Sequence, residues 1–204
     1  TDERSARWGG QLRAGIADAI EGLDRLLRIL SSTLDVAESE AGALRLHRRQ
    51  IHLGNLAREM VSLYQPAAEE QGLSLTATVH GRPMLRADQD LLRRALGNLL
   101  DNAIQHVPAG RSIQIVAEEK NEEVFLSVVD DGPGFAPGLA ETAFQRFVKG
   151  PASRGHGIGL ALVRAVARAH GGEATIRQLA GGGAAVQLRL PRQTDTAAAS
   201  AVAS

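Results

Sequence analysis

The sequence predicts a mixed α/β domain preceded by a long helix that packs in a bundle. A stretch without proline, from Trp8 to Gln65, carries apolar residues at alternating spacings of four and three. Beyond it, short runs of β-forming residues alternate with amphipathic helical segments. The 204 residues, 44% of them hydrophobic, are enough for one substantial core and a smaller element.

The amino-terminal helix is predicted by an apolar seam sustained over four heptads, which is typical of helices that pack against one another. Its members are Ile16, Ile20, Leu23, Leu27, Leu30, Leu34, Ala37, Ala41 and Leu44. A single helix cannot bury such a seam, so we expect a homodimer formed through residues 12–44. An intramolecular hairpin is the alternative, although the chain offers no second seam of similar length.

Three further helices are predicted from cap and stop signals. The first runs from Leu53 to about Gln71 and contains Pro66, which we expect to bend it. The second begins after a good N-cap, Asp88, and runs to about Val107. The third covers residues 158–170, and the basic, polar residues 45–52 are predicted to be a linker.

Strands are predicted where β-forming residues lie between turn residues, at 74–79, 83–87, 112–119, 123–130, 173–179 and 184–190. The first two flank a turn at His80–Gly81, and 112–119 and 123–130 pair across Lys120–Glu122. The last two form a hairpin over Gly181–Gly183. The alanine-rich residues 192–204 are predicted to be a disordered tail.

Composition excludes several classes of function. Twenty-three basic residues balance 23 acidic ones, so neither nucleic acid nor an anionic membrane is expected as a partner. The absence of cysteine excludes disulfides, thiolate metal sites and a cysteine nucleophile. No apolar run approaches the roughly 20 residues of a membrane span, and no signal peptide is visible. Because the chain begins at Thr1, we expect it to be the carboxy-terminal part of a longer protein.

The helix after Asp88 carries a stripe of amides. Asn98, Asn102 and Gln105 fall within about 60° of arc, opposite an apolar face. That face consists of Leu92, Leu96, Leu99, Ala103 and Val107. Carboxamides offer oxygen to Mg²⁺ and N–H donors to phosphate. A solvated polar face explains the stripe in isolation, but the motifs that follow favour a nucleotide site.

DDGPGF (130–135) follows directly on a largely apolar strand. A carboxylate at the end of that strand, Asp130, can accept a hydrogen bond from the amino group of adenine. Gly132 and Gly134 would leave room for the base. An ordinary turn is the alternative, because Asp-Gly and Pro-Gly dipeptides are turn signals.

GHGIGL (155–160) opens the third helix, where exposed N–H groups and the helix dipole can hold phosphate. A P-loop is excluded because Leu160 and Ala161 follow the last glycine. A dinucleotide-binding fingerprint is excluded because a loop, and not a strand, precedes the glycines.

AFQRF (143–147) lies between the acidic and glycine-rich motifs. Phe144 and Phe147 are predicted to be core residues. Arg146, Lys149 and Arg154 could screen a triphosphate, with plain surface charges as the alternative. The histidines have no metal-ligand partner at helical spacing, and His170 is predicted to mark a helix stop, so no zinc site is expected.

In this order the segments resemble the N, G1, F and G2 boxes of the GHKL ATPases. LLDNAIQH resembles the N box, DDGPGF the G1 box, FQRF the F box and GHGIGL the G2 box. The phrases NLLDNA, FQRF, GIGLALV and AHGG resemble sensor histidine kinases more than the chaperone, mismatch-repair or gyrase branches. The resemblance covers residues 53–191 and implies a two-layer α/β sandwich of the Bergerat type, a mixed sheet with helices on one face.

The resemblance also implies roles. Asn102 would coordinate Mg²⁺, Asn98 would support the phosphates, and Asp130 would bind the adenine amino group. Gln105 stands where many relatives have a basic residue, and the lid between Phe147 and Gly155 is short, so phosphate contacts and cover are expected to be weaker. The implied ATP-binding set is Asn98, Asn102, Gln105, Asp130, Gly132, Gly134, Arg146, Lys149, Gly155, His156, Gly157, Gly159 and Leu160.

The implied activity is that of a protein-histidine kinase with ATP and Mg²⁺ as cofactors and a response regulator as partner. The γ-phosphoryl would pass to a histidine and then to an aspartate of the regulator. The helix through SEAG (39–42) resembles the second helix of the kinase dimerisation hairpin, which places residues 1–48 in a dimerisation segment. No histidine precedes His47, so the acceptor is not expected in this chain, and no catalytic residue is assigned.

Two alternatives stay open. One is a GHKL scaffold that signals through nucleotide-dependent conformation without phosphoryl transfer. The other is a GHKL kinase acting on serine, which the long amino-terminal seam disfavours. The expected location is the cytoplasm, and an inner-membrane anchor elsewhere in the parent protein is compatible with it.

Overall fold

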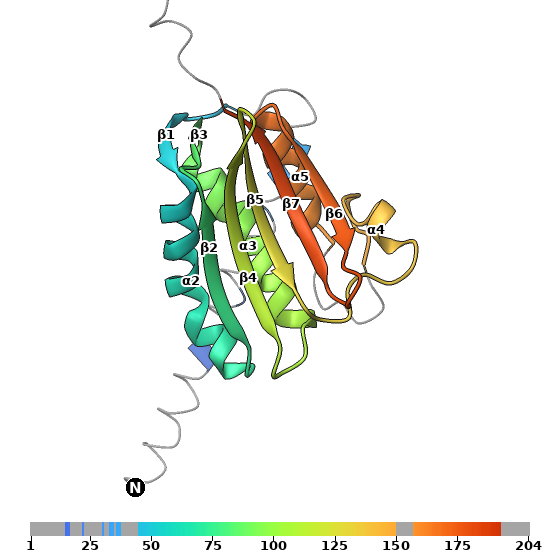
Figure 1. Cartoon of the computed structure of the whole chain (residues 1–204). Coiled ribbons are helices and arrows are strands. Elements are labelled where there is room, and N and C mark those ends of the chain that lie inside the picture. The colour runs from blue at the N-terminus through green and yellow to red at the C-terminus, as the bar shows by residue number, and fades with distance from the viewer. Residues whose placement is uncertain are drawn as a thin grey trace, which may run out of the picture.

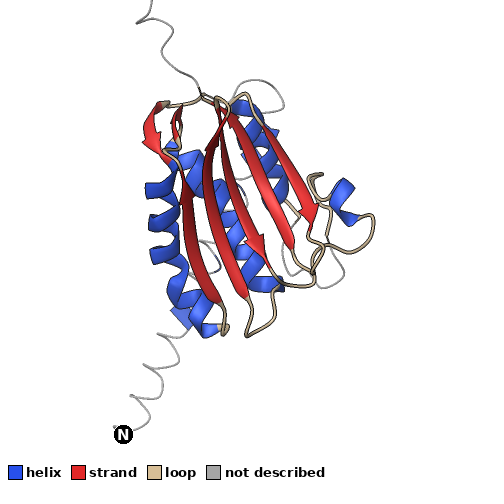
Figure 2. Cartoon of the chain, in the orientation of Figure 1, coloured by secondary structure: helices blue, strands red, loops and turns tan. Residues whose placement is uncertain are grey.

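The fold is a two-layer α/β sandwich, as predicted. The computed structural model describes residues 45–149 and 157–192, together with positions 15, 16, 22, 30, 33, 34, 36 and 37, which are helical. One layer is a five-stranded sheet, and the other consists of α2 (Leu53–Glu70), α3 (Gln89–His106) and α5 (Gly159–Ala169), which cover a single face of it (Figures 1 and 2). The mixed α/β class and the placement of helices on one face are therefore confirmed.

The sheet is mixed, with the strand order β2-β4-β5-β7-β6. Its strands are β2 (Ser74–His80), β4 (Ser112–Lys120), β5 (Glu123–Asp130), β6 (Glu173–Gln178) and β7 (Ala184–Pro191). Only β2 and β4 run parallel, and the other neighbours are antiparallel. The two predicted hairpins, β4–β5 and β6–β7, are confirmed. Asn121 and Glu122 both have positive φ, as a two-residue turn of type I′ requires.

The prediction of a linker at residues 45–52 is wrong for residues 49–52. Arg49–His52 form β1, which pairs antiparallel with β3 (Met84–Ala87) in a separate two-stranded sheet. Ile51 lies opposite Leu85, and both side chains are buried in the core. Burial of this apolar pair explains a strand in a basic segment. The strands on either side of His80–Gly81 exist, but they belong to different sheets.

The core lies between the sheet and the helices. The predicted apolar face of α3 is buried, with Leu92 and Leu96 fully covered. A four-residue helix, α4 (Leu139–Thr142), was not predicted. Of the two phenylalanines predicted to be core, Phe144 is buried but Phe147 is 67% exposed and has φ of 64°. The Phe147 prediction is therefore wrong, because the left-handed backbone at this residue leaves its side chain outside the core.

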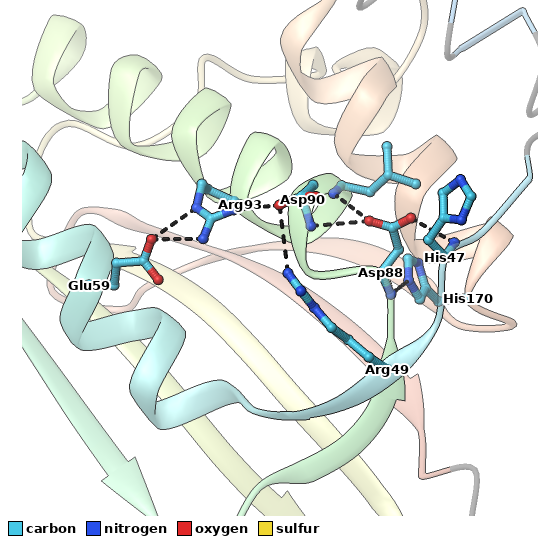
Figure 3. Close-up of polar contacts among 8 residues, drawn as sticks. His47, Arg49, Glu59, Asp88, Asp90, Arg93 and His170 are labelled. Atoms are coloured by element: carbon cyan, nitrogen blue, oxygen red, sulfur yellow. Dashed lines mark hydrogen bonds and ion pairs between the residues drawn. The ribbon is translucent and has the colours of Figure 1, made fainter.

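Asp88 joins three parts of the chain (Figure 3). Its Oδ1 accepts hydrogen bonds from the N–H groups of Asp90 and Leu91, both at 3.1 Å, which makes it the predicted N-cap of α3. Its Oδ2 accepts from the backbone N–H of His47 at 2.9 Å. Its own N–H donates to Nε2 of His170 at 3.0 Å, at the end of α5.

The residues before β1 are thereby attached to both helices. The Arg48 guanidinium also donates to the carbonyl oxygen of Ala169 at 3.1 Å, in the last turn of α5. Of the apolar seam, Ile16, Leu30 and Leu34 are exposed, and most of its other members lie outside the described residues. Every helix in the described part is too short or too polar to cross a bilayer.

Candidate nucleotide-binding site

Asp130 is the last residue of β5, and its carboxylate bonds to the glycine-containing turn that follows the strand. Its Oδ1 accepts a hydrogen bond from the N–H of Gly132 at 3.0 Å. A Cβ at Gly132 would lie 3.0 Å from this oxygen and 3.1 Å from Cγ2 of Val107, at the end of α3. The missing side chain therefore allows residues 130–135, called the acidic turn below, to pack against α3.

The electrostatics separate the two neighbouring aspartates. Burial raises the pKa of Asp130, although hydrogen bonds from the N–H groups of Gly132 and Ala184 oppose this shift. Asp131 instead accepts from the Ser112 N–H at 2.8 Å and from its hydroxyl at 3.0 Å, and the backbone bond lowers the pKa of Asp131. Asp131 fastens the turn to β4, so Asp130 is the carboxylate that remains for a ligand.

The amide stripe on α3 lies between two contacts with other motifs. The side chain of Asn98 donates to the Arg94 carbonyl at 2.9 Å, and its Oδ1 would lie 2.9 Å from a Cβ at Gly159. Asn98 therefore faces the first residue of α5. Val107 touches the acidic turn at the other end, and the half-buried Asn102 lies between these two contacts. Gln105 is exposed.

The start of α5 is joined to the FQRF segment. The Gly157 carbonyl accepts the N–H of Phe147 at 2.8 Å, and a Cβ at Gly157 would lie 2.7 Å from the Phe147 carbonyl carbon and the Val148 oxygen. Gly157 has φ of 70°, which also favours glycine. The N-cap of α5 is Ile158, whose apolar side chain cannot accept hydrogen bonds from the first-turn N–H groups.

The other predicted residues are placed less centrally. Arg146 is half-buried, Lys149 is exposed, and Leu160 packs against the core. The guanidinium of Arg164, on α5, lies 6.0 Å from the centroid of the Phe144 ring, which ties this segment to the helix. Arg154, Gly155 and His156 lie outside the described residues.

The donor set fits a nucleotide with its metal ion. The half-buried carboxylate of Asp130, beside a glycine turn, suits an exocyclic amino group. The uncapped N–H groups at the start of α5 suit phosphate. Within residues 45–149 and 157–192, no cluster of three His, Asp or Glu side chains could hold a metal by itself. The carboxamide of Asn102, together with phosphate oxygens, is the ligand set the residues offer to Mg²⁺.

Two contributing residues were not found from the sequence. Gln178, at the end of β6, bonds to the backbone of Phe135 in the acidic turn, and His170 bonds to the backbone of Asp88. A glutamine in an alternating strand carries no motif. The AHGG ending pointed only to a helix stop at His170, so neither contact had a sequence signal beyond the residue type.

The chain is similar in sequence and in structure to histidine kinases and related ATPases. The model of the family described as histidine kinase-, DNA gyrase B-, and HSP90-like ATPase matches residues 87–194. The probable sensor protein PcoS of Escherichia coli is 37% identical over 164 residues, which cover 78% of this chain and 35% of that protein. The chain thus spans about a third of this relative.

Solved structures agree on the fold. Full-length ShkA, crystallised with AMPPNP, superposes with a TM-score of 0.78 at 30% identity, covering 89% of this chain and 39% of ShkA. The histidine kinase ThkA, in complex with the response regulator TrrA, has a TM-score of 0.67 at 21% identity over 83% of this chain and 49% of ThkA. The chain belongs to the family of histidine kinase-, DNA gyrase B- and HSP90-like ATPases.

Proposed function

We propose that residues 53–191 are the Mg-ATP-binding catalytic domain of a sensor histidine kinase and that residues 1–48 supply its dimerisation helix. The observation that carries this proposal is the position of Asn102 on α3. It lies between Asn98, which faces the start of α5, and Val107, which touches the acidic turn. A ligand that reaches from Asp130 to the start of α5 along the amide face of α3 would pass Asn102.

In this proposal each element performs one task. Asp130 accepts a hydrogen bond from the amino group of adenine, and Gly132 and Gly134 leave space for the base. The N–H groups in the first turn of α5 donate hydrogen bonds to phosphate. Asn102 provides oxygen to Mg²⁺, with Asn98 beside it. The metal ion, when bound, neutralises phosphate charge and orients the triphosphate.

We propose phosphoryl transfer to a histidine that is not in this chain. An imidazole nitrogen attacks the γ-phosphorus as the bond to the bridging oxygen breaks, leaving ADP, so catalysis is mainly positioning and charge stabilisation. The phosphoryl group then passes to an aspartate of a response regulator. The relatives named as sensors, and the regulator bound to ThkA, support this partner class.

Titration calorimetry with Mg-ATP tests the site. Asp130→Ala removes a hydrogen bond to a charged acceptor, so affinity should fall by about 10- to 100-fold or more. Asn102→Asp should abolish binding, because it places a carboxylate against phosphate. Asp131→Asn is the matched control, since it keeps the acceptor for Ser112. Unchanged affinity in Asp130→Ala and Asn102→Asp, with folding intact, would contradict the proposal.

A second experiment separates a kinase from a scaffold. The chain is mixed with radiolabelled ATP and a separate helical segment that carries the acceptor histidine of a relative. The kinase proposal predicts a labelled histidine, and the label should disappear with Asn102→Asp. Absence of label, where the intact relative labels itself, would favour a nucleotide-dependent scaffold.

A further inference from the structure

Gln178 makes a pair of hydrogen bonds to the acidic turn that resembles a β-bridge. It is the last residue of β6, and its Nε2 donates to the carbonyl oxygen of Phe135 at 2.7 Å. Its Oε1 accepts the N–H of Phe135 at 3.1 Å. Because the backbone carbonyl can only accept and the N–H can only donate, these partners fix the orientation of the carboxamide.

The surrounding backbone is shaped to receive this side chain. Gly134 has φ of 73°, and a Cβ there would lie 2.5 Å from Oε1 of Gln178 and 3.0 Å from the carbonyl oxygen of Gly183. A Cβ at Gly183 would in turn lie 2.0 Å from the carbonyl oxygen of Asp130. The glycine turn of the β6–β7 hairpin and the acidic turn therefore lie in direct contact.

The face of the strand on which Gln178 lies explains why it reaches this turn. Ala174 and Ile176 of β6 pack toward the helices, and Gln178 follows them on the same face by the two-residue period of a strand. Arg177 lies on the opposite face, and both Arg177 and Gln178 are exposed. Gln178 thus extends the inner face of β6 past its last core residue and onto the backbone of Phe135.

We propose that Gln178 is a positioning residue for purine recognition: its carboxamide holds the turn 132–135 so that the carboxylate of Asp130 keeps one orientation. The connection runs through the turn, because Gly132, three residues before Phe135, donates its N–H to Asp130 Oδ1. This inference rests on the proposed ATP site. A firmly held carboxylate accepts the 6-amino group of adenine and repels the 6-oxo group of guanine, so Gln178 contributes to the choice between the two bases.

The test compares three variants of the full chain by titration with Mg-ATP, Mg-GTP and magnesium tripolyphosphate. Gln178→Leu removes both hydrogen bonds, and Gln178→Glu keeps only the acceptor. Arg177→Leu, on the other face of the same strand, is the matched control. Gln178→Leu should lower ATP affinity about three- to tenfold and lower the ATP-over-GTP preference by a similar factor. Its affinity for tripolyphosphate, which has no base, should not change, and Gln178→Glu should be intermediate.

Two results would overturn the inference. One is wild-type ATP affinity and base preference in Gln178→Leu. The other is an equal loss for ATP and tripolyphosphate, which would indicate a general structural defect. Asp130→Ala separates this failure from that of the ATP site: if Asp130→Ala weakens ATP binding and Gln178→Leu does not, only the inference about Gln178 fails.

Hydrogen exchange covers the case in which Gln178→Leu does not fold. The amide of Phe135 should exchange more rapidly in Gln178→Ala than in the wild type, because this N–H loses its acceptor, Oε1 of Gln178. Equal exchange rates would show that the pair does not hold the turn, and would also overturn the inference.

Discussion

At the scale of single residues, two glycines with nearly the same backbone conformation have different surroundings. Gly157 has φ of 70° and Gly110 has φ of 80°. A Cβ at Gly157 would lie 2.7 Å from the backbone of Phe147 and Val148, whereas a Cβ at Gly110 would meet nothing within 4 Å. The pair therefore separates the cost of left-handed backbone from the cost of contact with the FQRF segment.

Gly110→Ala should lose about 1–2 kcal/mol of unfolding free energy, which is the cost of a left-handed residue with a side chain. Gly157→Ala should lose more, because the added methyl displaces the backbone of Phe147. It should also weaken Mg-ATP binding, since this glycine lies just before the start of α5. Urea denaturation and calorimetry measure the two effects. Equal stability losses, with equal ATP affinity, would contradict the close approach at Gly157.

Individual motif residues could be predicted because their residue types are chemically unusual where they stand. Two asparagines one turn apart on a helix, and a carboxylate followed by glycines at a strand end, indicate a polar ligand without any knowledge of the fold. Gln178 could not be predicted in this way. Its role depends on a backbone 43 residues away in sequence, and its residue type is ordinary for a strand end.

At the scale of elements, α5 is held by its buried face. Leu162 of α5 is fully buried, whereas Leu63 of α2 is 63% exposed. Leu162→Ala should therefore lower the free energy of unfolding by about 2–5 kcal/mol, because it leaves a cavity between the helix and the core. Leu63→Ala, the same change in another helix, should alter it by less than about 0.5 kcal/mol. Denaturant unfolding of both variants measures the difference, and similar losses would contradict the packing described for α5.

Which segments form helices or strands could be predicted better than which strands pair with one another. The helices α2, α3 and α5 begin and end within about one or two residues of the positions that caps and glycines indicate. The strand β1 was not predicted, because a four-residue segment with one buried apolar side chain has no recognisable period. Its partner β3 lies beyond α2 and β2 in sequence, so the pairing depends on tertiary packing that no local pattern encodes.

At the scale of the whole molecule, Asp88 and His170 connect the ends of the two helices that carry the proposed phosphate site. Asn98 and Asn102 lie further along α3 from Asp88, and His170 follows the end of α5, whose start faces Asn98. The residues 47–48 are bonded to both helix ends. A displacement of the segment before β1 would therefore act on α3 and α5 together.

The protonation state of His170 is determined by its two partners. Its Nδ1 lies 2.8 Å from the carbonyl oxygen of Val166, so this nitrogen carries the proton and donates. Its Nε2 must then be unprotonated, because it accepts the N–H of Asp88 at 3.0 Å. Protonation of Nε2 would place its N–H against the backbone N–H of Asp88 in a buried site. The negative charge of the Asp88 carboxylate offsets part of this cost.

Acid should therefore loosen this connection. Burial lowers the pKa of His170; the charge of Arg48 acts in the same direction, while the bond to Val166 and the charge of Asp88 oppose it. An unfolded histidine has a pKa of about 6.5, so between that value and the lower folded pKa the unfolded state binds more protons. Stability should fall as pH drops through this window, by at most about 1.4 kcal/mol per pH unit for one proton.

Asp88 affects stability in a separate, more acidic pH range than His170 does. Burial alone would raise this pKa, but the N–H groups of His47, Leu91 and Asp90 outweigh it and hold the pKa below its usual range. The stability that Asp88 contributes is complete above its unfolded pKa and is lost only as pH falls through the lower, folded value. A loss of stability between pH 7.5 and 5.5 therefore does not come from this carboxylate.

His170→Gln tests the assignment, because a carboxamide offers a donor and an acceptor but does not titrate. Urea denaturation at pH 7.5, 6.5 and 5.5 should give a stability that falls with pH in the wild type. His170→Gln should be less stable at pH 7.5 but should have a shallower dependence on pH. His80→Gln, at an exposed position on β2, is the control and should keep the wild-type slope. If His170→Gln kept that slope as well, the acid sensitivity would come from other groups, and the neutral imidazole bonded to Asp88 would not be its source.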